Sequence, residues 1–220
     1  MSLEIQIIEI AARAIVISGT ATFLAAIWGI PLGIIIGLRR FHGRSLVVSF
    51  FNAMLGMPTV ALGLILYLIF SRSGPLGFLH LLYTPIAMIL GQAVLVTPIL
   101  ISFVTSTVES VDPEIKDLAK TLGASETEAS MAVLRESIGG VLLAIAASFN
   151  RAIAELGVAL MLGGNLRGLT RVLTTSIALE TTRGELMLGI ALTIILLFIA
   201  LTINFSMNIL QNKVRSWLWR

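Results

Sequence analysis

The chain has 220 residues, of which 57% are apolar and 12% carry a charge, and its mean hydropathy is +0.99. Soluble domains carry about 25% charged and about 45–50% apolar residues, so a water-soluble enzyme is excluded. The formal net charge is +3, there is no cysteine, and the basic residues form no patch interleaved with aromatic residues. We therefore expect no nucleic-acid partner, and no disulfide, thiolate metal site or cysteine nucleophile.

The apolar residues gather in five segments that carry few charges. Each supplies about 20 residues, the length that a helix needs to cross a bilayer. We expect an all-α polytopic membrane protein with spans at about 12–38, 46–71, 84–108, 138–162 and 186–210. Gly29, Gly33 and Gly37 recur on one face of the first span, which predicts close approach of another helix. Pro58 is expected to bend the second span and to leave backbone groups near Thr59 facing a path.

The basic residues between the spans predict the orientation. One set of alternate connections holds Arg39, Arg40, Arg44, Lys116, Lys120, Arg135, Lys213, Arg215 and Arg220. The other set holds Arg13, Arg72, Arg167, Arg171 and Arg183. Cytoplasmic connections carry the excess of Lys and Arg, so nine against five places the N-terminus outside and the C-terminus in the cytoplasm.

The connection between the third and fourth spans is acidic and has helical signals of its own. It holds Glu109, Asp112, Glu114, Asp117, Glu126, Glu128 and Glu136, seven of the chain's twelve acids. Asp112 and Pro113 are typical of a helix start, Gly123 interrupts the helical pattern, and a second short helix is expected near Ser125. The pattern indicates either a compact protrusion that docks into a partner or a solvated loop.

One stretch of this connection carries a family resemblance. It runs Asp117-Leu118-Ala119-Lys120-Thr121-Leu122-Gly123-Ala124-Ser125. It resembles the EAA loop of the membrane-spanning subunits of binding-protein-dependent ABC importers, although Asp117-Leu118 replaces Glu-Ala and Arg135-Glu136 replaces the later Leu-Pro. The resemblance implies a type I importer permease fold, with 112–136 as the cytoplasmic coupling segment that contacts the ATPase. Its coupling residues would be Asp117, Ala119, Leu122, Gly123, Ala124 and Ser125.

Three further stretches resemble oxyanion permeases, and together they extend the resemblance over most of the chain. They are 56–64, 149–157 and 163–171, the last being most similar to tungstate members. The resemblance implies one permease domain over 1–220, in the inner or cytoplasmic membrane, that carries tungstate; molybdate or sulfate is the alternative cargo. The implied partners are a second copy of the chain, cytoplasmic ATP-binding subunits, the lipid bilayer and an extracytoplasmic binding protein that holds most of the selectivity.

Two charged residues lie well inside a predicted span. Arg151 and Glu155 are four residues apart, so on a continuous helix they share a face and can pair. Ionisable groups at membrane depth normally face a bundle interior or a water-filled path. The pair either shapes the translocation path or gate, together with Asn150, Pro58 and Thr59, or it is a structural ion pair that fixes helix packing.

The connection 163–185 holds polar groups that suit anions. Asn165, Arg167 and Arg171 stand among several threonines, and the two arginines would share a face if the segment were helical. Three interpretations are open here: anion handling, a docking surface for a binding protein, or a capped surface loop. The resemblance implies an outer gate element.

The sequence contains no machinery for catalysis. It has no GxxxxGK[ST] phosphate loop, its two histidines lie in different connections, and its acids lack a catalytic or metal-ligand partner. We expect no enzyme activity, metal or cofactor in this chain, with ATP hydrolysed by a partner. An ion-coupled secondary transporter, the alternative class, predicts internal repeats, and the sequence shows none that is convincing.

Overall fold

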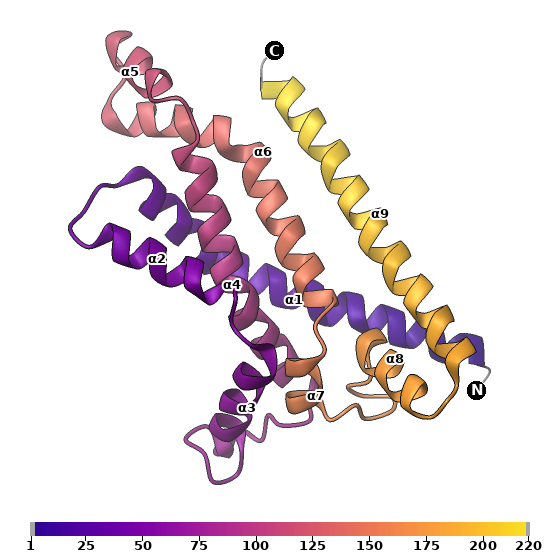
Figure 1. Ribbon diagram of the computed structural model, residues 1–220. Helices are drawn as coiled ribbons and strands as arrows, with labels where there is room; N and C mark the ends of the chain where they lie inside the picture. The colour runs from indigo at the N-terminus through magenta and orange to yellow at the C-terminus, as the bar shows by residue number, and fades with distance from the viewer. Residues whose placement is uncertain (1–2, 219–220) are drawn as a thin grey trace. The chain divides into compact units, whose positions relative to one another are not determined.

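The computed structural model describes residues 3–218, and within that range every regular element is a helix (Figure 1). The elements in chain order are α1 (Leu3–Leu38), α2 (Arg44–Met54), α3 (Thr59–Phe70), the 3-10 helix η1 (Gly77–Leu79), α4 (Pro85–Glu109), α5 (Pro113–Thr121), α6 (Glu126–Ile153), α7 (Gly157–Gly163), α8 (Leu173–Thr182) and α9 (Leu186–Leu218). The all-α class is therefore confirmed. Arg220, one of the residues used to predict orientation, lies outside the described residues.

Four helices, α1, α4, α6 and α9, are long and apolar enough to cross a membrane. The helices α2 and α3 pass the same test only as a pair, and they are bent by 99° at the break between them. The expected spans are thus confirmed in number only if this bent pair counts as one span.

The expected bend of the second span at Pro58 is present, but 46–71 forms two helices and not one. Helix α2 ends at Met54, and α3 resumes at Thr59 with Pro58 as its N-cap residue in an extended conformation. Proline has no backbone N–H to donate, and it disfavours the helical conformation in the residue before it. As a consequence, the helix is interrupted before Pro58 and is not merely kinked there.

The predicted fourth span also differs from the structure. Helix α6 begins at Glu126 and ends at Ile153, and α7 follows only at Gly157. The expected second short helix near Ser125 is therefore the first turn of α6. Ser125 and Glu128 cap that turn, because the Ser125 N–H donates to Glu128 Oε2 at 2.8 Å and the Glu128 N–H donates to Ser125 Oγ at 3.3 Å.

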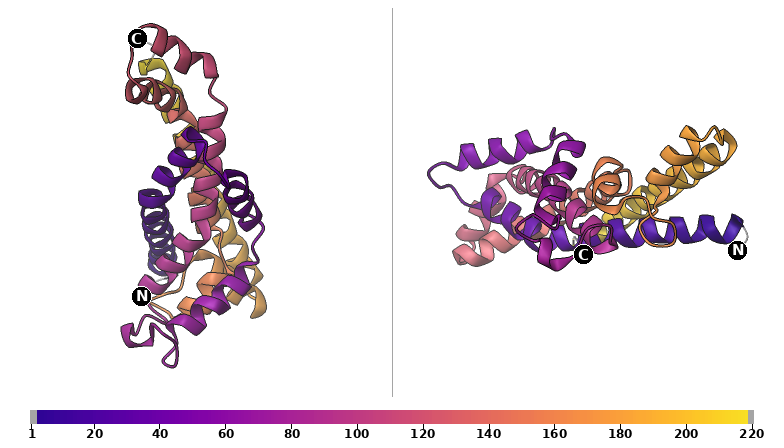
Figure 2. Two further views of the ribbon diagram at one scale, coloured as in Figure 1. Left: turned by 90° about the vertical axis from the view of Figure 1, so that its left-hand side faces the viewer. Right: turned by 90° about the horizontal axis from the view of Figure 1, so that it is seen from below.

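The chain divides into two compact units, and the helices α1, α4, α6 and α9 contribute residues to both. The first unit comprises 1–24, 57–96 and 149–202. Inside it α3 and α7 lie side by side (Figures 1 and 2). Their shared core contains Leu62, Phe70, Ala87, Leu95, Val158 and Leu162. Gly63 allows the close approach, since a Cβ there would lie 3.0 Å from the Met161 side chain.

The second unit comprises 25–56, 97–148 and 203–220. Gly29, Gly33 and Gly37 of α1 pack against α4, as the sequence predicts. A Cβ on Gly33 would lie 2.8 Å from Val104 Cβ, and one on Gly37 would lie 2.8 Å from Val108 Cβ. Thr105 Oγ1 donates to the Gly33 carbonyl at 3.1 Å, which adds a hydrogen bond to the contact.

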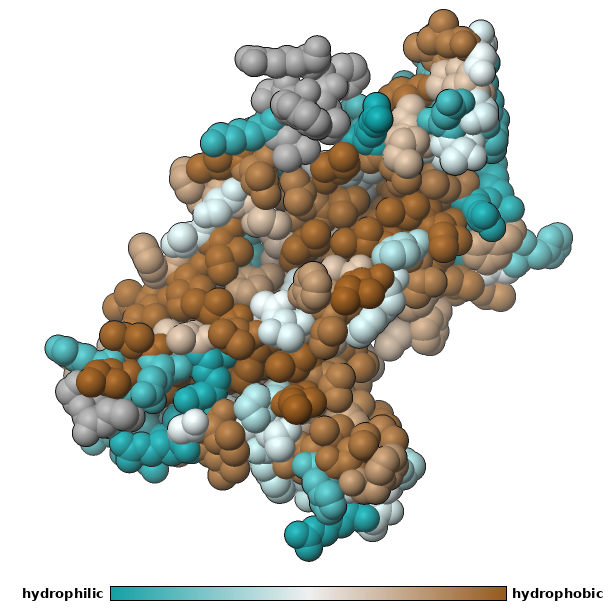
Figure 3. All heavy atoms as spheres, turned by 180° about the vertical axis from the view of Figure 1, so that it is seen from behind, coloured by the Kyte–Doolittle hydropathy of each residue, from teal (hydrophilic) through white to brown (hydrophobic). Residues whose placement is uncertain are grey.

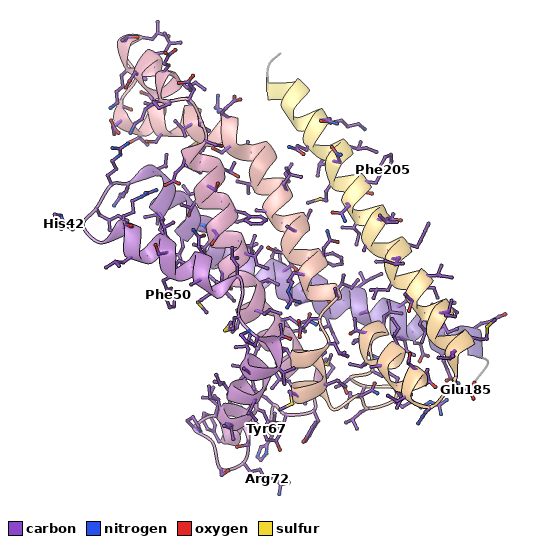
Figure 4. The ribbon with its side chains drawn as sticks, in the orientation of Figure 1. His42, Phe50, Tyr67, Arg72, Glu185 and Phe205 are labelled. Atoms are coloured by element: carbon purple, nitrogen blue, oxygen red, sulfur yellow. The ribbon has the colours of Figure 1, made fainter. Side chains whose placement is uncertain are left out.

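Large apolar side chains remain exposed along α9 (Figure 3). Examples are Leu197, Phe198 and Leu201, and Phe205, labelled in Figure 4. Such a surface is stable in lipid or against another apolar surface, and it is not compatible with water.

Candidate functional site

The break between α6 and α7 holds a buried carboxylate. Glu155 is 2% exposed, and its Oε2 accepts a hydrogen bond from Arg151 Nη1 at 2.6 Å. Its Oε1 accepts from the Val158 N–H at 2.9 Å, in the first turn of α7. A buried carboxylate is costly unless it is paired and hydrogen-bonded, and Glu155 satisfies both conditions.

The expected ion pair between Arg151 and Glu155 is present, although the two residues do not share a helical face. Helix α6 ends at Ile153, so Glu155 lies beyond its last turn. The Glu155 N–H donates to the Ala152 carbonyl at 3.1 Å, a tightened turn that ends the helix. The pairing therefore bridges the end of α6 and the start of α7. The Arg151 side chain is still 36% exposed.

A third helix is fastened to the same residue. Thr174 Oγ1, in the first turn of α8, donates to the Glu155 carbonyl at 2.8 Å. Glu155 therefore joins α6, α7 and α8 through its side chain and its backbone. We refer to Arg151, Glu155, Val158 and Thr174 as the break cluster.

The two interrupted spans meet at this place. A Cβ on Gly157, the first residue of α7, would lie 2.7 Å from Thr59 Oγ1 and 3.0 Å from the Val60 backbone nitrogen. The break at Pro58 and Thr59 therefore lies against the break at Glu155. Broken helices at membrane depth are tolerated where they are buried in protein or line a polar cavity. Asn150, in the last turn of α6, accepts from the Ala154 N–H with its carbonyl at 3.2 Å.

The coupling segment lies in the second unit, and its predicted helix start is confirmed. Asp112 Oδ1 accepts from the Glu114 N–H at 2.9 Å, and Pro113 is the first residue of α5. Gly123 has φ +90°, a left-handed conformation that favours glycine, and it allows the Ala124 N–H to bond the Ala119 carbonyl at 3.0 Å.

The surface of α5 suits a contact with another protein. Leu118 is 62% exposed, and Leu122, just past the helix end, is 81% exposed. A groove of about 520 Å³ lies beside them, lined by Ile115, Leu118, Glu128, Met131, Ala132, Arg135 and Glu136. Lys116 and Lys120 both pair with Glu126, with Lys120 Nζ at 2.6 Å, and they hold α5 against the start of α6. The Glu126 carboxylate raises the pKa of Lys120, so the pair stays charged at neutral pH.

The connection 163–185 contains the helix α8 and ends at Glu185, labelled in Figure 4. Its part before α8 is not helical, so Arg167 and Arg171 do not share a helical face. Arg171 Nε donates to Asn165 Oδ1 at 3.2 Å, and its Nη2 donates to the Asn165 carbonyl at 3.4 Å. Arg167 is exposed and takes no part in these two hydrogen bonds. Burial lowers the pKa of Arg171; nearby Arg183, Arg167 and Arg13 act in the same direction, whereas Glu180 opposes them.

Sequence reasoning missed three residues that complete these clusters. Thr174 was one of several threonines, Gly157 one of many glycines, and Arg13 was noted only for its charge. Their partners are distant in the chain, so no local spacing connects them. Among the described residues no group of three His, Cys, Asp or Glu side chains is arranged to hold a metal ion.

Comparison with known proteins places these features in a family. Residues 29–217 match the family of the binding-protein-dependent transport system inner membrane component. The chain is 40% identical over 203 residues to a protein of Haloferax volcanii named probable anion ABC transporter permease protein, with 90% of this chain and 88% of that protein covered.

Two other relatives carry the names of specific anions. The tungstate uptake system permease protein TupB of Peptoclostridium acidaminophilum is 38% identical over 213 residues, with 97% and 93% of the two chains covered. The sulfate transport system permease protein CysT of Salmonella typhimurium is 27% identical over 200 residues, with 88% and 72% covered.

The fold is also found among solved structures. A chain from the inward-facing structures of the MetNI methionine ABC transporter superposes with a TM-score of 0.78, covering 97% of this chain and 99% of that one. The two are 15% identical, so this likeness concerns the fold alone.

Proposed function

Because the chain belongs to the family of binding-protein-dependent transport system inner membrane components and is a permease of an ABC oxyanion importer, we propose that the oxyanion it carries is tungstate. The observation that carries this proposal is the 38% identity, over 97% of this chain, to a protein named a tungstate uptake permease. The sulfate relative is 27% identical and a molybdenum relative from Haemophilus influenzae 26% identical. Molybdate and sulfate are the alternative cargoes.

The permease is one part of a larger assembly. ATP hydrolysis belongs to a separate ATPase subunit, and a binding protein delivers the cargo. We propose that two copies of this chain form the pore, since four or five spans enclose little space by themselves. The exposed apolar side chains of α9 suit lipid or a second copy. The positive-inside rule supports an N-terminus outside and a C-terminus in the cytoplasm.

The coupling segment 112–136 is the proposed contact with the ATPase. Its exposed Leu118 and Leu122 supply apolar surface, and the pairs of Glu126 with Lys116 and Lys120 connect α5 to α6. Helix α6 is uninterrupted from Glu126 to Ile153. One helix therefore connects the coupling segment to Arg151 along the chain.

The break cluster is the proposed gate. A helix that ends at Ile153 and restarts at Gly157 changes direction more easily than a continuous one. Regular helical hydrogen bonding does not continue through Glu155. Three hydrogen bonds of this residue instead hold α6, α7 and α8 in one arrangement, which we take as the closed gate. Breaking one contact is the natural switching event. The connection 163–185, fastened through Thr174, is the proposed outer gate element.

ATPase stimulation in liposomes tests the function. This chain is assembled with its ATPase, and a binding protein loaded with tungstate, molybdate or sulfate is added outside. Stimulation by the tungstate-loaded form alone supports the proposal. Equal stimulation by molybdate makes tungstate one of several cargoes, and no stimulation by any of the three contradicts the proposed cargo.

A further inference from the structure

Two arginines from distant parts of the chain come together in the first unit. Arg13 lies on α1, and its Nη1 donates to the backbone carbonyl of Arg171 at 2.9 Å, across 158 residues of sequence. The Arg171 guanidinium in turn donates to the side-chain and backbone oxygens of Asn165. Every acceptor in this arrangement is neutral. The Arg13 guanidinium is therefore held at the backbone of Arg171, and within the described residues neither guanidinium is bonded to a carboxylate.

No carboxylate within the described part of the chain lies at ion-pair distance from Arg13 or Arg171. Glu180, whose charge acts to raise the pKa of Arg171, already pairs with Arg183 Nη1 at 3.4 Å. Glu9, a described residue one turn before Arg13 on α1, makes no ion pair with it. Arg167, exposed in the same connection, adds another cation. Grouping like charges that are partly buried is unfavourable, and a bound anion removes the cost.

We infer that Arg13 and Arg171 form a binding site for one tetrahedral oxyanion on the permease itself. The choice of oxyanion as ligand class rests on the proposed function. Selectivity in such a system is expected mainly from the binding protein, and this site would add a second point of recognition. We call Arg13, Asn165 and Arg171 the arginine site.

The donors at the arginine site suit this ligand. A guanidinium has five N–H donors in a rigid fork that matches the oxygens of an oxyanion. Arg171 uses one N–H of Nε and one of Nη2 for Asn165, and Arg13 uses one N–H of Nη1, so both guanidinium groups keep N–H donors for a ligand. Both side chains are partly buried, so the ligand is held with less screening than on an open surface.

Asn165 is the positioning residue of the site. It has φ +54°, a left-handed conformation that asparagine tolerates better than most residues. Its Nδ2 donates to the Thr175 carbonyl at 3.5 Å, and this contact ties the arginine site to α8. Asn165 thus fixes the guanidinium of Arg171 before any ligand arrives.

The alternative occupant is an acidic side chain of the binding protein. Leu166 and Leu169, which flank Arg167, are exposed and suit a protein contact. Arg13 and Arg171 are less exposed than Arg167, which favours a small anion at the arginine site.

Equilibrium binding tests the inference. The permease assembled with its ATPase in lipid nanodiscs, without binding protein or ATP, is titrated calorimetrically with sodium tungstate, molybdate, sulfate and chloride at constant ionic strength. We expect saturable binding of one oxyanion per permease chain and none of chloride. Arg13→Gln and Arg171→Gln should each weaken binding about tenfold, the usual effect of losing one charged hydrogen-bonding group. Arg72→Gln, an exposed arginine of another connection labelled in Figure 4, should leave binding unchanged.

Thermal unfolding of the same samples separates binding from folding. At one fixed tungstate concentration the Tm should rise in the wild type and in Arg72→Gln, and should rise less in Arg13→Gln and Arg171→Gln. Arg13→Gln is the more informative variant, because the Arg13 side chain donates to a backbone carbonyl and its loss should leave the ligand-free Tm within a few degrees of the wild type. Arg171→Lys, which keeps the charge without the fork, should bind with intermediate affinity.

Several results would overturn the inference: no saturable oxyanion binding to the wild type, equal weakening by Arg72→Gln, or no weakening by either site variant. If the variants instead lose only their association with a loaded binding protein, the surface is a protein docking site and the inference is wrong. Binding of sulfate but not tungstate would support the arginine site while contradicting the proposed cargo.

Discussion

Thr174 and Glu155 are 19 residues apart, yet the Thr174 hydroxyl donates to the Glu155 backbone carbonyl at 2.8 Å. This hydrogen bond fastens α8 to the break between α6 and α7, where the helix ladder leaves carbonyl groups without a helical partner. Thr174 is 9% exposed, so no bulk water replaces the bond when it is lost. The connection 163–185 and the buried carboxylate are thereby joined by a direct hydrogen bond.

Thr174→Val tests that fastening, because valine keeps the shape of threonine and removes the donor. We expect a loss of about 1–3 kcal/mol of stability, the cost of leaving a buried acceptor unpaired. The measurement is the Tm of the purified assembly, together with ATPase activity in the absence of binding protein. Thr182→Val is the matched control, since that hydroxyl is exposed and bonds only to Leu179 of its own helix. Equal losses of stability in Thr174→Val and Thr182→Val would show that the hydrogen bond from Thr174 to Glu155 does not stabilise the break between α6 and α7.

Glu155→Gln tests the break cluster. Glutamine still accepts from the Val158 N–H, but the Arg151 guanidinium loses its buried counter-charge. We expect a loss of about 1–3 kcal/mol of stability, below that of a fully buried pair, because the Arg151 side chain is 36% exposed.

The double variant Arg151→Gln with Glu155→Gln should be more stable than the sum of the two single losses indicates, since the pair is removed together. Glu185→Gln, an exposed acid at the start of α9, should have no measurable effect. Stability losses that add simply in a double-mutant cycle would show that Arg151 and Glu155 do not act as a pair. Transport measured in the same variants then separates a gate from a packing role. If the pair is purely structural, the double variant should regain transport together with stability.

The sequence predicted the features whose causes are local. Apolar length located most of each span, the glycines of α1 predicted a close contact with another helix, and Asp112 with Pro113 predicted the start of α5. The two breaks were not predicted, because apolar residues continue on both sides of each of them. Pro58 gave a signal for a bend but not its size of 99°. Nothing near Glu155 signals a helix end; the residue is held there by Arg151, Val158 and Thr174. Arg13 reaches Arg171 only through the fold.

Gly123→Ala tests the coupling segment. Gly123 has φ +90°, and no atom lies within 4 Å of the position that an alanine methyl group would occupy, so alanine introduces backbone strain without a steric clash. The strain is expected to cost about 1 kcal/mol and to shift the α5–α6 turn. We expect less transport per ATP hydrolysed, with membrane insertion unchanged. Gly123→Pro should uncouple transport from ATP hydrolysis more completely. Proline also removes the Gly123 N–H, which donates to the Lys120 carbonyl at 3.0 Å.

Gly184→Ala is the control for this strain. Gly184 has φ +82°, is equally open, and lies in the turn between α8 and α9, away from the coupling segment in sequence. It should lose similar stability while keeping the ratio of transport to ATP hydrolysis. Normal coupling in Gly123→Pro would count against the docking role of 112–136.

Glu126→Gln tests the electrostatic connection between α5 and α6. It removes the shared partner of Lys116 and Lys120 and should weaken coupling, more so at low salt, where exposed ion pairs are less screened. The pKa of Lys120 is raised, so its stabilising contribution is fully present below the ordinary lysine pKa and is lost only as pH rises through the raised value. The difference between wild type and Glu126→Gln should therefore be constant from about pH 6 to about pH 9. A difference that changes within this range would require another titrating group.

Gly33→Ala tests the packing of α1 against α4. A Cβ there would lie 2.8 Å from Val104 Cβ and 3.1 Å from the Ile101 carbonyl oxygen, and neither can move without shifting a helix. We expect a destabilisation of about 1–3 kcal/mol, typical of an overpacked contact. Gly19→Ala, on the same helix, is the matched control, because its nearest neighbour would be Phe149 Cε2 at 4.0 Å. With room for the methyl group, the higher helix propensity of alanine should leave Gly19→Ala neutral or more stable by up to about 1 kcal/mol. The comparison is made by thermal unfolding of the two variants, and a Gly33→Ala protein as stable as Gly19→Ala would show that α1 and α4 are not in this close contact.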